Sequence, residues 1–207
     1  MNRRHLLLSL PPLGLLAACA ATPPPAPEGP EISYSYLPKL RLNVASIDID
    51  PTRPNAGPTD IGRELRPTPP EAVQIMGRDR LAAFGTENAA RFVTLRAAIL
   101  RERLPAQSGL FAGDPGERLN CTLTCRLEIR GANDQRLGFA EATVSRTAPT
   151  ESSVAARTRS ATSLLRRATF DLNTEFEFQL RRALRDWLVE GERAAPPPPG
   201  GVVRESL

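Results

Sequence analysis

The sequence predicts an α+β fold, in which a mainly antiparallel sheet packs against two helices as a two-layer domain with the order β-α-β-β-β-α. Three observations predict it. Residues 118–130 alternate between apolar and polar, as a half-buried strand does. The turn sequence at 131–134 joins this strand to another at 136–147, which predicts a hairpin. Residues 160–190 instead place apolar side chains every three or four positions, which indicates an amphipathic helix.

The composition divides the 207 residues into four parts. Residues 1–18 have the features of a signal peptide, and residues 19–31 form a proline-rich tether. Residues 32–192 are long enough for a single α+β domain with one core. Residues 193–207 are rich in proline and glycine, and we expect them to be disordered.

The N-terminus carries the pattern of a secretory signal. Arg3 and Arg4 precede an apolar run at 6–16, which is too short to span a bilayer, since that needs about 20 residues. Its ending, Leu16-Ala17-Ala18-Cys19, resembles the bacterial lipobox. The resemblance implies cleavage before Cys19, a diacylglycerol on its sulfur and an acyl chain such as palmitate on its amino group. The alternative is an ordinary signal peptide with a chance cysteine.

The residues after Cys19 bear on localisation. By analogy with enteric lipoproteins, Ala20 in place of Asp favours the outer membrane over the inner one. A proline-rich tether extends by about 3.1 Å per residue, so this one reaches roughly 35 Å. We expect the domain to stand clear of the headgroups, on the periplasmic face of the membrane.

Charge and histidine content argue against several functions. The formal charge is +4, and loss of Arg3 and Arg4 leaves 25 basic against 23 acidic residues, a charge of +2. Charge therefore gives no support for nucleic-acid binding. The only histidine is His5, inside the signal, which argues against histidine-based triads and zinc helices. We found no phosphate-loop motif and expect no cofactor; the glycine-rich stretch at 109–118 is interpreted as a mobile loop.

The first half of the domain is predicted to contain one strand and one helix. Residues 39–50 are predicted to form a strand. Its apolar residues fall at even positions up to Val44 and at odd positions from Ile47, and a bulge near Ala45 and Ser46 would place both sets on one face. Residues 51–68 have loop composition. A helix is expected from the N-cap Thr68 to Gly85. Its packing face is expected to comprise Val73, Met76, Gly77, Arg80, Leu81 and Phe84.

Residues 90–104 are ambiguous. Their Ala, Arg and Leu content favours a helix, whereas the alternation of Val93, Leu95, Ala97 and Ile99 favours a strand, which we prefer. The next strand, 118–130, carries Cys121 and Cys125 on its apolar face. Four residues of strand separate them by roughly 13 Å, too far for a disulfide. We expect two reduced, buried thiols; a disulfide would require a different secondary structure, and no other soft ligand suggests a metal site.

The final helix is predicted to have two distinct faces. Its core stripe is expected to contain Leu165, Thr169, Leu172, Phe176, Leu180, Ala183 and Trp187. The opposite side combines aromatic residues with arginine, the types enriched at protein interfaces. These candidate interface residues are Arg167, Phe170, Phe178, Arg181, Arg185 and Leu188. The alternative is that another element covers this side, or that the exposed apolar residues carry no function.

Several segments together resemble a family of uncharacterised alphaproteobacterial lipoproteins. They are the lipobox, the proline tether, "LRLNVASIDID", "PEAVQIMGRDRLAAFG", the cysteine-containing hairpin and "FDLNTEFEFQLRRALRDWL". The element order is also similar to that of the lipopolysaccharide-assembly lipoprotein and of auxiliary lipoproteins of ABC-type lipid transporters. This similarity is analogy, and it transfers no functional residue.

The sequence leaves three functional hypotheses. The first is a non-enzymatic envelope lipoprotein that is anchored in the membrane by its lipid and docks onto another envelope protein of a transport or assembly complex. The second is binding of anionic lipid or lipopolysaccharide by Arg157, Arg159 and Arg166. The third is an enzyme that uses the carboxylates of Asp48, Asp50 and Asp60, which are otherwise ordinary solvated side chains.

Overall fold

The computed structural model describes residues 32–104, 117–150 and 153–189. Cys19 and the proposed signal and tether lie outside the described residues, and so does the predicted tail at 193–207. Of the predicted loop at 109–118, only residues 117 and 118 are described, and they begin a strand. The described part has the predicted α+β architecture. In chain order the elements are β1 (Leu40–Leu42), β2 (Ser46–Ile49), η1 (Gly62–Glu64), α1 (Pro69–Arg80), β3 (Leu81–Ala83), β4 (Ala89–Arg103), β5 (Glu117–Arg130), β6 (Arg136–Pro149), α2 (Val154–Ala183) and η2 (Arg185–Trp187).

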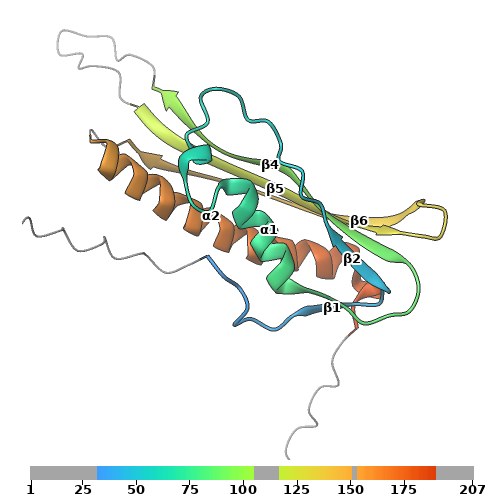
Figure 1. The fold of residues 1–207 in the computed structure, drawn as a ribbon. Helices are drawn as coiled ribbons and strands as arrows, with labels where there is room; N and C mark the ends of the chain where they lie inside the picture. The colour runs from blue at the N-terminus through green and yellow to red at the C-terminus, as the bar shows by residue number, and fades with distance from the viewer. Residues whose placement is uncertain (1–31, 105–116, 151–152, 190–207) are drawn as a thin grey trace, which may run out of the picture. The chain divides into compact units, whose positions relative to one another are not determined.

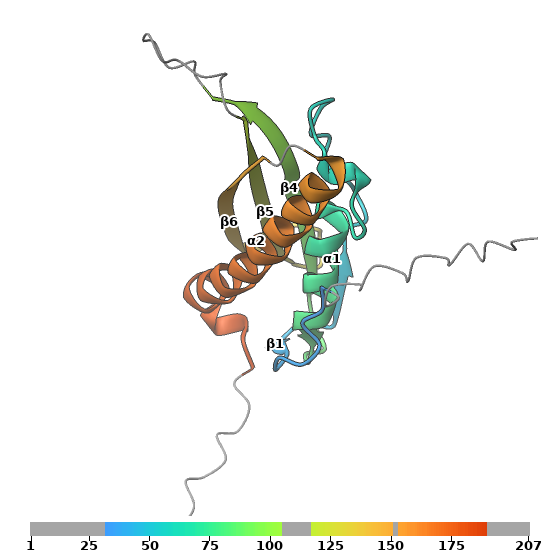
Figure 2. The same cartoon turned by 90° about the vertical axis from the view of Figure 1, so that its left-hand side faces the viewer.

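The strands form two sheets. The larger has the order β2-β4-β5-β6, with β2 parallel to β4 and the other pairs antiparallel, and the smaller pairs β1 with β3 in parallel. Both helices lie on one face of the larger sheet, α1 against β4 and α2 across β5 and β6 (Figures 1 and 2). The result is one layer of sheet and one layer of helices. Within the described residues, no helix combines the length and the apolarity needed to cross a membrane.

Strand β5 confirms the alternation read from the sequence. Its six inward residues are fully buried against the helices: Leu119, Cys121, Leu123, Cys125, Leu127 and Ile129. Both cysteines are free thiols, as predicted. The hairpin to β6 is also confirmed, and Asp134 adopts a left-handed conformation in its turn, with φ of 57°.

Residues 90–104 are a strand, as preferred, but the predicted inward residues are partly wrong. A β-bulge between Thr94 and Arg96 shifts the register against β5. Before the bulge Phe92 and Thr94 face the core, and after it Ala97 and Ile99 do. Leu95 lies at the irregularity and is exposed. The extra residue of a bulge reverses the parity of a strand, which a fixed alternation cannot describe.

The predicted single strand at 39–50 is two strands in different sheets. The backbone between them turns away at residues 43–45 instead of bulging within one strand. Asn43 N–H donates to the carbonyl of Trp187 at 2.8 Å, and Ala45 N–H lies 3.0 Å from the carbonyls of Glu87 and Asn88. Contacts with segments far away in the sequence therefore determine this break.

Helix α1 starts at the predicted cap, where Thr68 N–H donates to Glu71 Oε2 at 2.9 Å, but it ends earlier than predicted. The chain turns into β3 directly after Arg80 because Leu81 pairs with Leu40. Phe84 is therefore not on a packing face and is 52% exposed. Gly85 has a different role: a Cβ there would lie 2.6 Å from Val44 N, so the backbones approach too closely for a side chain.

Helix α2 begins earlier than predicted and ends at Ala183. Most of the expected stripe is buried, with Leu165, Thr169, Leu172, Phe176 and Leu180 all at 1% exposure or less. The prediction that Ala183 belongs to the core stripe is wrong, because Ala183 is exposed and the neighbouring Leu184 is buried instead. Trp187, in η2, packs against the core while remaining half-buried.

Candidate functional site: a groove beside the final helix

A groove of about 520 Å³ lies between α2 and the segment that leads into β1. The segment at 37–40 forms one wall, and α2 residues 170–181 form the other. Arg80, the last residue of α1, lies at the bottom between them. The full lining is Leu37, Pro38, Lys39, Leu40, Arg80, Phe170, Asn173, Thr174, Glu177, Phe178 and Arg181.

The floor of the groove is built around a buried arginine. The side chain of Arg80 is 2% exposed, and its Nε donates to Asn173 Oδ1 at 2.7 Å. Its terminal nitrogens donate to the carbonyl of Pro38 and to Glu177 Oε2. One guanidinium therefore joins α1, α2 and the segment before β1, and fixes both walls of the groove relative to each other.

The charges in the groove are unequal. Lys39, Arg80 and Arg181 are three cations, and Glu177 is the single carboxylate of the lining. Glu177 is shared, because its Oε2 accepts from Arg80 while its Oε1 accepts from Arg181 at 2.8 Å. Lys39 is exposed and is the only lysine in the whole sequence. The groove therefore presents an excess of positive charge.

The apolar part of the groove comes from α2. Phe170 and Phe178 are 55% and 58% exposed. Eight helical residues separate them by about 12 Å, so both rings flank the same stretch of groove. Large exposed aromatic rings beside arginine are typical anchors of protein interfaces.

Of the six residues predicted for a partner interface, Phe170, Phe178 and Arg181 line this groove. Arg167 and Arg185 are exposed outside its lining. Leu188 is different: it forms an isolated antiparallel bridge with Leu42 and packs half-buried against the core. Its packing role is a correction to the sequence interpretation.

The groove also contains residues that the sequence did not single out: Lys39, Asn173 and Glu177. Arg80 was assigned only to a packing face. That assignment could have predicted the role of Arg80 in the floor of the groove, because an arginine on the apolar face of a helix needs a buried partner. Asn173 and Glu177, four residues apart on α2, supply it.

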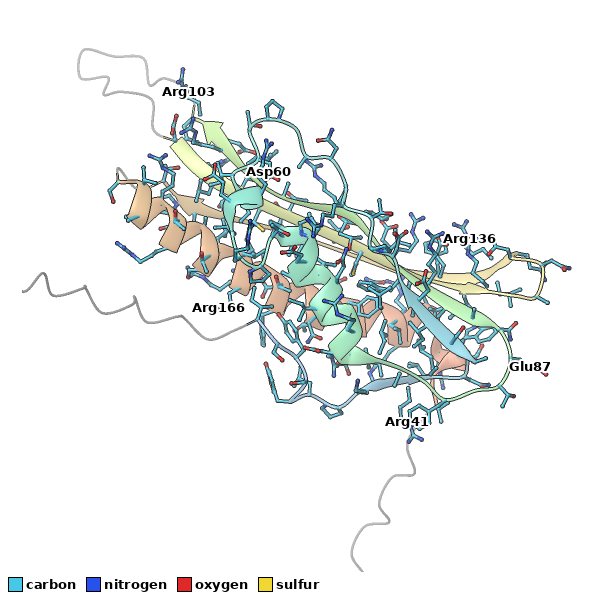
Figure 3. All side chains as sticks on the ribbon, viewed as in Figure 1. Arg41, Asp60, Glu87, Arg103, Arg136 and Arg166 are labelled. Carbon is cyan, nitrogen blue, oxygen red and sulfur yellow. The ribbon has the colours of Figure 1, made fainter. Side chains whose placement is uncertain are left out.

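The arginines proposed for anionic lipid do not form one cluster. At about 100° per residue, Arg159 and Arg166 share a side of α2, and Arg157 projects from a different one. Arg159 is exposed, while Arg157 and Arg166 are half-buried (Arg166 is labelled in Figure 3). None of the three lines the groove.

The three aspartates do not form one site either, because Asp48 and Asp50 share Arg91 while Asp60 lies apart. Asp50, buried next to Phe92, pairs with Arg91 at 2.7 Å, and Asp48, whose side chain is 72% exposed, lies 4.0 Å from the same arginine. The Asp60 carboxylate instead accepts a hydrogen bond from the backbone N–H of Ile99. On β4, Ile99 lies seven residues of about 3.3 Å each beyond Phe92, the residue beside Asp50. In the described segments, no three acidic, cysteine or histidine side chains come together as a metal site would need.

Comparison with known proteins gives no family assignment. No family model matches the sequence, and no curated protein matches it. The fold has distant likenesses among solved structures. A candidate lipoprotein of Caulobacter crescentus is 13% identical at a TM-score of 0.36, over 67% of this chain and 88% of that one.

Two further solved structures, also of lipoproteins, have similarly low identities and TM-scores. A minor lipoprotein of Acinetobacter baumannii is 13% identical at a TM-score of 0.37, over 73% of this chain and 99% of that one. The uncharacterised lipoprotein B of Nitrosomonas europaea is 16% identical at a TM-score of 0.32, over 69% and 86%. At these values the likenesses assign neither a family nor a function to the chain.

Proposed function

We propose that this protein is a membrane-anchored periplasmic lipoprotein that acts without enzymatic activity, as a docking subunit of an envelope transport or assembly complex. The observation that carries the docking role is the pair Phe170 and Phe178, exposed on one wall of a groove with excess positive charge. The lipobox ending at Cys19 supports the anchor, and Ala20 supports the outer membrane as its location.

The occupant we propose is an acidic, apolar segment of another envelope protein. Three cations facing one carboxylate favour a partner that brings acidic side chains. The two phenylalanine rings favour apolar side chains between those acids. A lipid-anchored domain on a tether of roughly 35 Å is well placed to hold such a partner near the membrane surface.

The first experiment removes the two aromatic anchors. In the lipidated full-length protein, Phe170→Ala with Phe178→Ala is expected to abolish recovery of the partner. Truncation of an interface hot spot costs about 2 kcal/mol or more, roughly thirtyfold in affinity. The matched control is Phe84→Ala with Phe139→Ala, which removes two other exposed rings, 52% and 44% exposed. Partner recovery should survive in the control.

Thermal unfolding separates docking from stability. The Phe170 and Phe178 rings are more than half exposed, so their removal should change the melting temperature little. A large fall in melting temperature would assign both rings to the core. Unchanged partner recovery would remove the interface.

The single lysine gives a second, independent test. A carbodiimide joins an amine to a carboxylate without a spacer, so it should link Lys39 to an aspartate or glutamate of the partner. Mass spectrometry of the linked peptides then identifies the bound segment. A crosslink that maps to a segment without neighbouring apolar residues, or none in a complex that still co-purifies, would contradict the groove as the docking site.

A further inference from the structure

A second hollow, of about 320 Å³, lies away from the groove at the start of α1. The loop between β2 and α1 forms most of it, and the loop crosses beside β4, as the position of Asp60 shows in Figure 3. Three arginines line it, Arg53, Arg63 and Arg66, together with the carboxylates of Asp60 and Glu71.

Two of these arginines are held in place by backbone carbonyls instead of by direct ion pairs. Arg63 donates from Nε to the carbonyl of Asp60 at 3.0 Å and from Nη2 to that of Gly57 at 2.7 Å. Arg66 Nη1 donates to the carbonyls of Leu65 at 2.7 Å and of Arg63 at 3.3 Å. Neither has an ion pair with a carboxylate of the described residues. Since a guanidinium has five N–H donors, each keeps donors for a ligand.

The two carboxylates of the hollow are already engaged. Asp60 Oδ1 accepts the backbone N–H groups of Gly62 and Ile99, each at 2.9 Å. Glu71 accepts from Thr68 N–H at 2.9 Å and pairs with Arg53 at 2.7 Å. The hydrogen bond from Thr68 and the charges of Arg53 and Arg66 hold the pKa of Glu71 below its usual range. The lining therefore has three guanidinium groups against two carboxylates, a formal excess of one positive charge.

A smaller hollow, of about 260 Å³, adjoins the first. The two share Pro54 and Ala97 in their linings. The surface of the second hollow is mixed: Leu95, which the β4 bulge leaves exposed, and Leu100 contribute apolar groups, and Asn55 and Arg96 contribute polar ones. A cationic hollow next to a mixed one suits a ligand with an anionic head and a partly polar organic remainder.

We propose that the hollow at the start of α1 binds a phosphate-bearing anion, held by the guanidinium groups of Arg63 and Arg66. Planar guanidinium forks match phosphate oxygens in geometry and charge. The neighbouring hollow at Leu95 and Leu100 receives the glycerol part of such a ligand, or the start of its acyl chain. This site is independent of the proposed docking groove and shares no lining residue with it.

The test uses the full-length chain with Cys19→Ser, so that a lipid anchor does not itself bind vesicles. Inorganic phosphate and glycerol 3-phosphate are titrated by calorimetry. Vesicles of phosphatidylcholine, with or without phosphatidylglycerol, are used in sedimentation. Arg63→Gln with Arg66→Gln is expected to weaken binding of the anion by at least about tenfold, because it removes the charge-assisted hydrogen bonds of both guanidinium groups.

The control is Arg78→Gln with Arg103→Gln, which removes the same charge from exposed positions outside the hollow. It should bind like the parent chain. Binding to phosphatidylglycerol vesicles identifies a lipid headgroup, and binding of the soluble phosphates alone identifies a free phosphate compound. No binding by the parent chain to any probe, or an equal loss in test and control variants, would overturn the site.

Arg63 and Arg66 donate hydrogen bonds to carbonyls of their own loop, so replacing both can unfold the loop, and a milder variant is needed. If the double variant unfolds, Arg66→Lys keeps the charge but loses the planar fork, and it should still bind the phosphate more weakly than the parent chain. Circular dichroism verifies that the variant is folded. Unchanged affinity in a folded Arg66→Lys protein would remove Arg66 from the site.

Discussion

The Nε of Arg80 donates to Oδ1 of Asn173 at 2.7 Å, and this hydrogen bond joins the last residue of α1 to the middle of α2. Because Arg80 also binds the Pro38 carbonyl and Glu177, one buried cation serves three segments. The groove exists where these segments meet. The same side chain therefore contributes to stability and shapes the proposed docking surface.

Arg80→Met should lower the free energy of unfolding by about 3–5 kcal/mol. The substitution keeps an apolar stem but leaves Asn173, the Pro38 carbonyl and the Glu177 carboxylate without their donor. Urea unfolding measures the change. Arg181→Met is the matched control, since Arg181 is exposed and pairs with the same Glu177; it should cost less than about 1 kcal/mol. Similar costs for the two variants would contradict the central role of Arg80.

Gly77→Ala should destabilise the protein, although alanine favours helices. A Cβ at residue 77 would lie 2.8 Å from two carbons of the Phe92 ring, which also packs edge-on against Phe176 at 5.5 Å. Overpacking costs about 1–3 kcal/mol, against a helix gain of about 1 kcal/mol. Chemical denaturation of Gly77→Ala, Phe92→Leu and the double variant measures the coupling. The double variant should lose less than the sum of the single ones.

Local pattern was sufficient to predict β5 and most of α2. The six inward residues of β5 follow a strict alternation, and the stripe from Leu165 to Leu180 follows a strict helical spacing. In each element the spacing of the apolar residues shows which face is buried, so the sequence alone is sufficient to predict it. The cap at Thr68 was likewise local, since its partner Glu71 lies three residues away.

The sequence predictions were wrong where contacts between residues far apart in the chain determine the secondary structure. The break after β1 depends on Trp187 and Glu87, and the end of α1 depends on the pairing of Leu81 with Leu40. Half of the groove was visible in the sequence as exposed aromatic residues on α2. The other half was not, because Lys39 and Arg80 come from separate segments that only the fold brings together.

Cys121 and Cys125 should react slowly with a thiol reagent in the native protein and quickly in denaturant. Burial raises the pKa of Cys121 to about 12 and also raises that of Cys125. At pH 8 the thiolate, which is the reactive form, is therefore a very small minority of Cys121. Labelling followed by mass spectrometry measures the rates. An intact mass lower by two hydrogens would show a disulfide and contradict the reduced state.

Asp50 should contribute stability that disappears in acid. Hydrogen bonds from Thr52, followed by the ion pair with Arg91, lower its pKa from the ordinary 3.8. A lowered folded-state pKa contributes fully above about pH 4 and is lost as the pH falls through the lower value. Asp50→Asn should therefore be less stable than the parent at pH 7, with a gap that narrows toward pH 2.5. Asp48→Asn, at an exposed carboxylate, should change stability little at either pH.

The last prediction concerns the anchor. Leu16-Ala17-Ala18-Cys19 follows a short apolar run in the register of a lipobox, so Cys19 should carry lipid after export. Several acyl chains hold a protein on a membrane durably, where one is marginal. Globomycin, which blocks the lipoprotein signal peptidase, should cause the unprocessed precursor to accumulate. Cys19→Ala should release the protein from the membrane fraction. Normal processing under globomycin, together with Cys19→Ala protein that still sediments with membranes, would contradict lipidation and leave the signal as an ordinary secretory one.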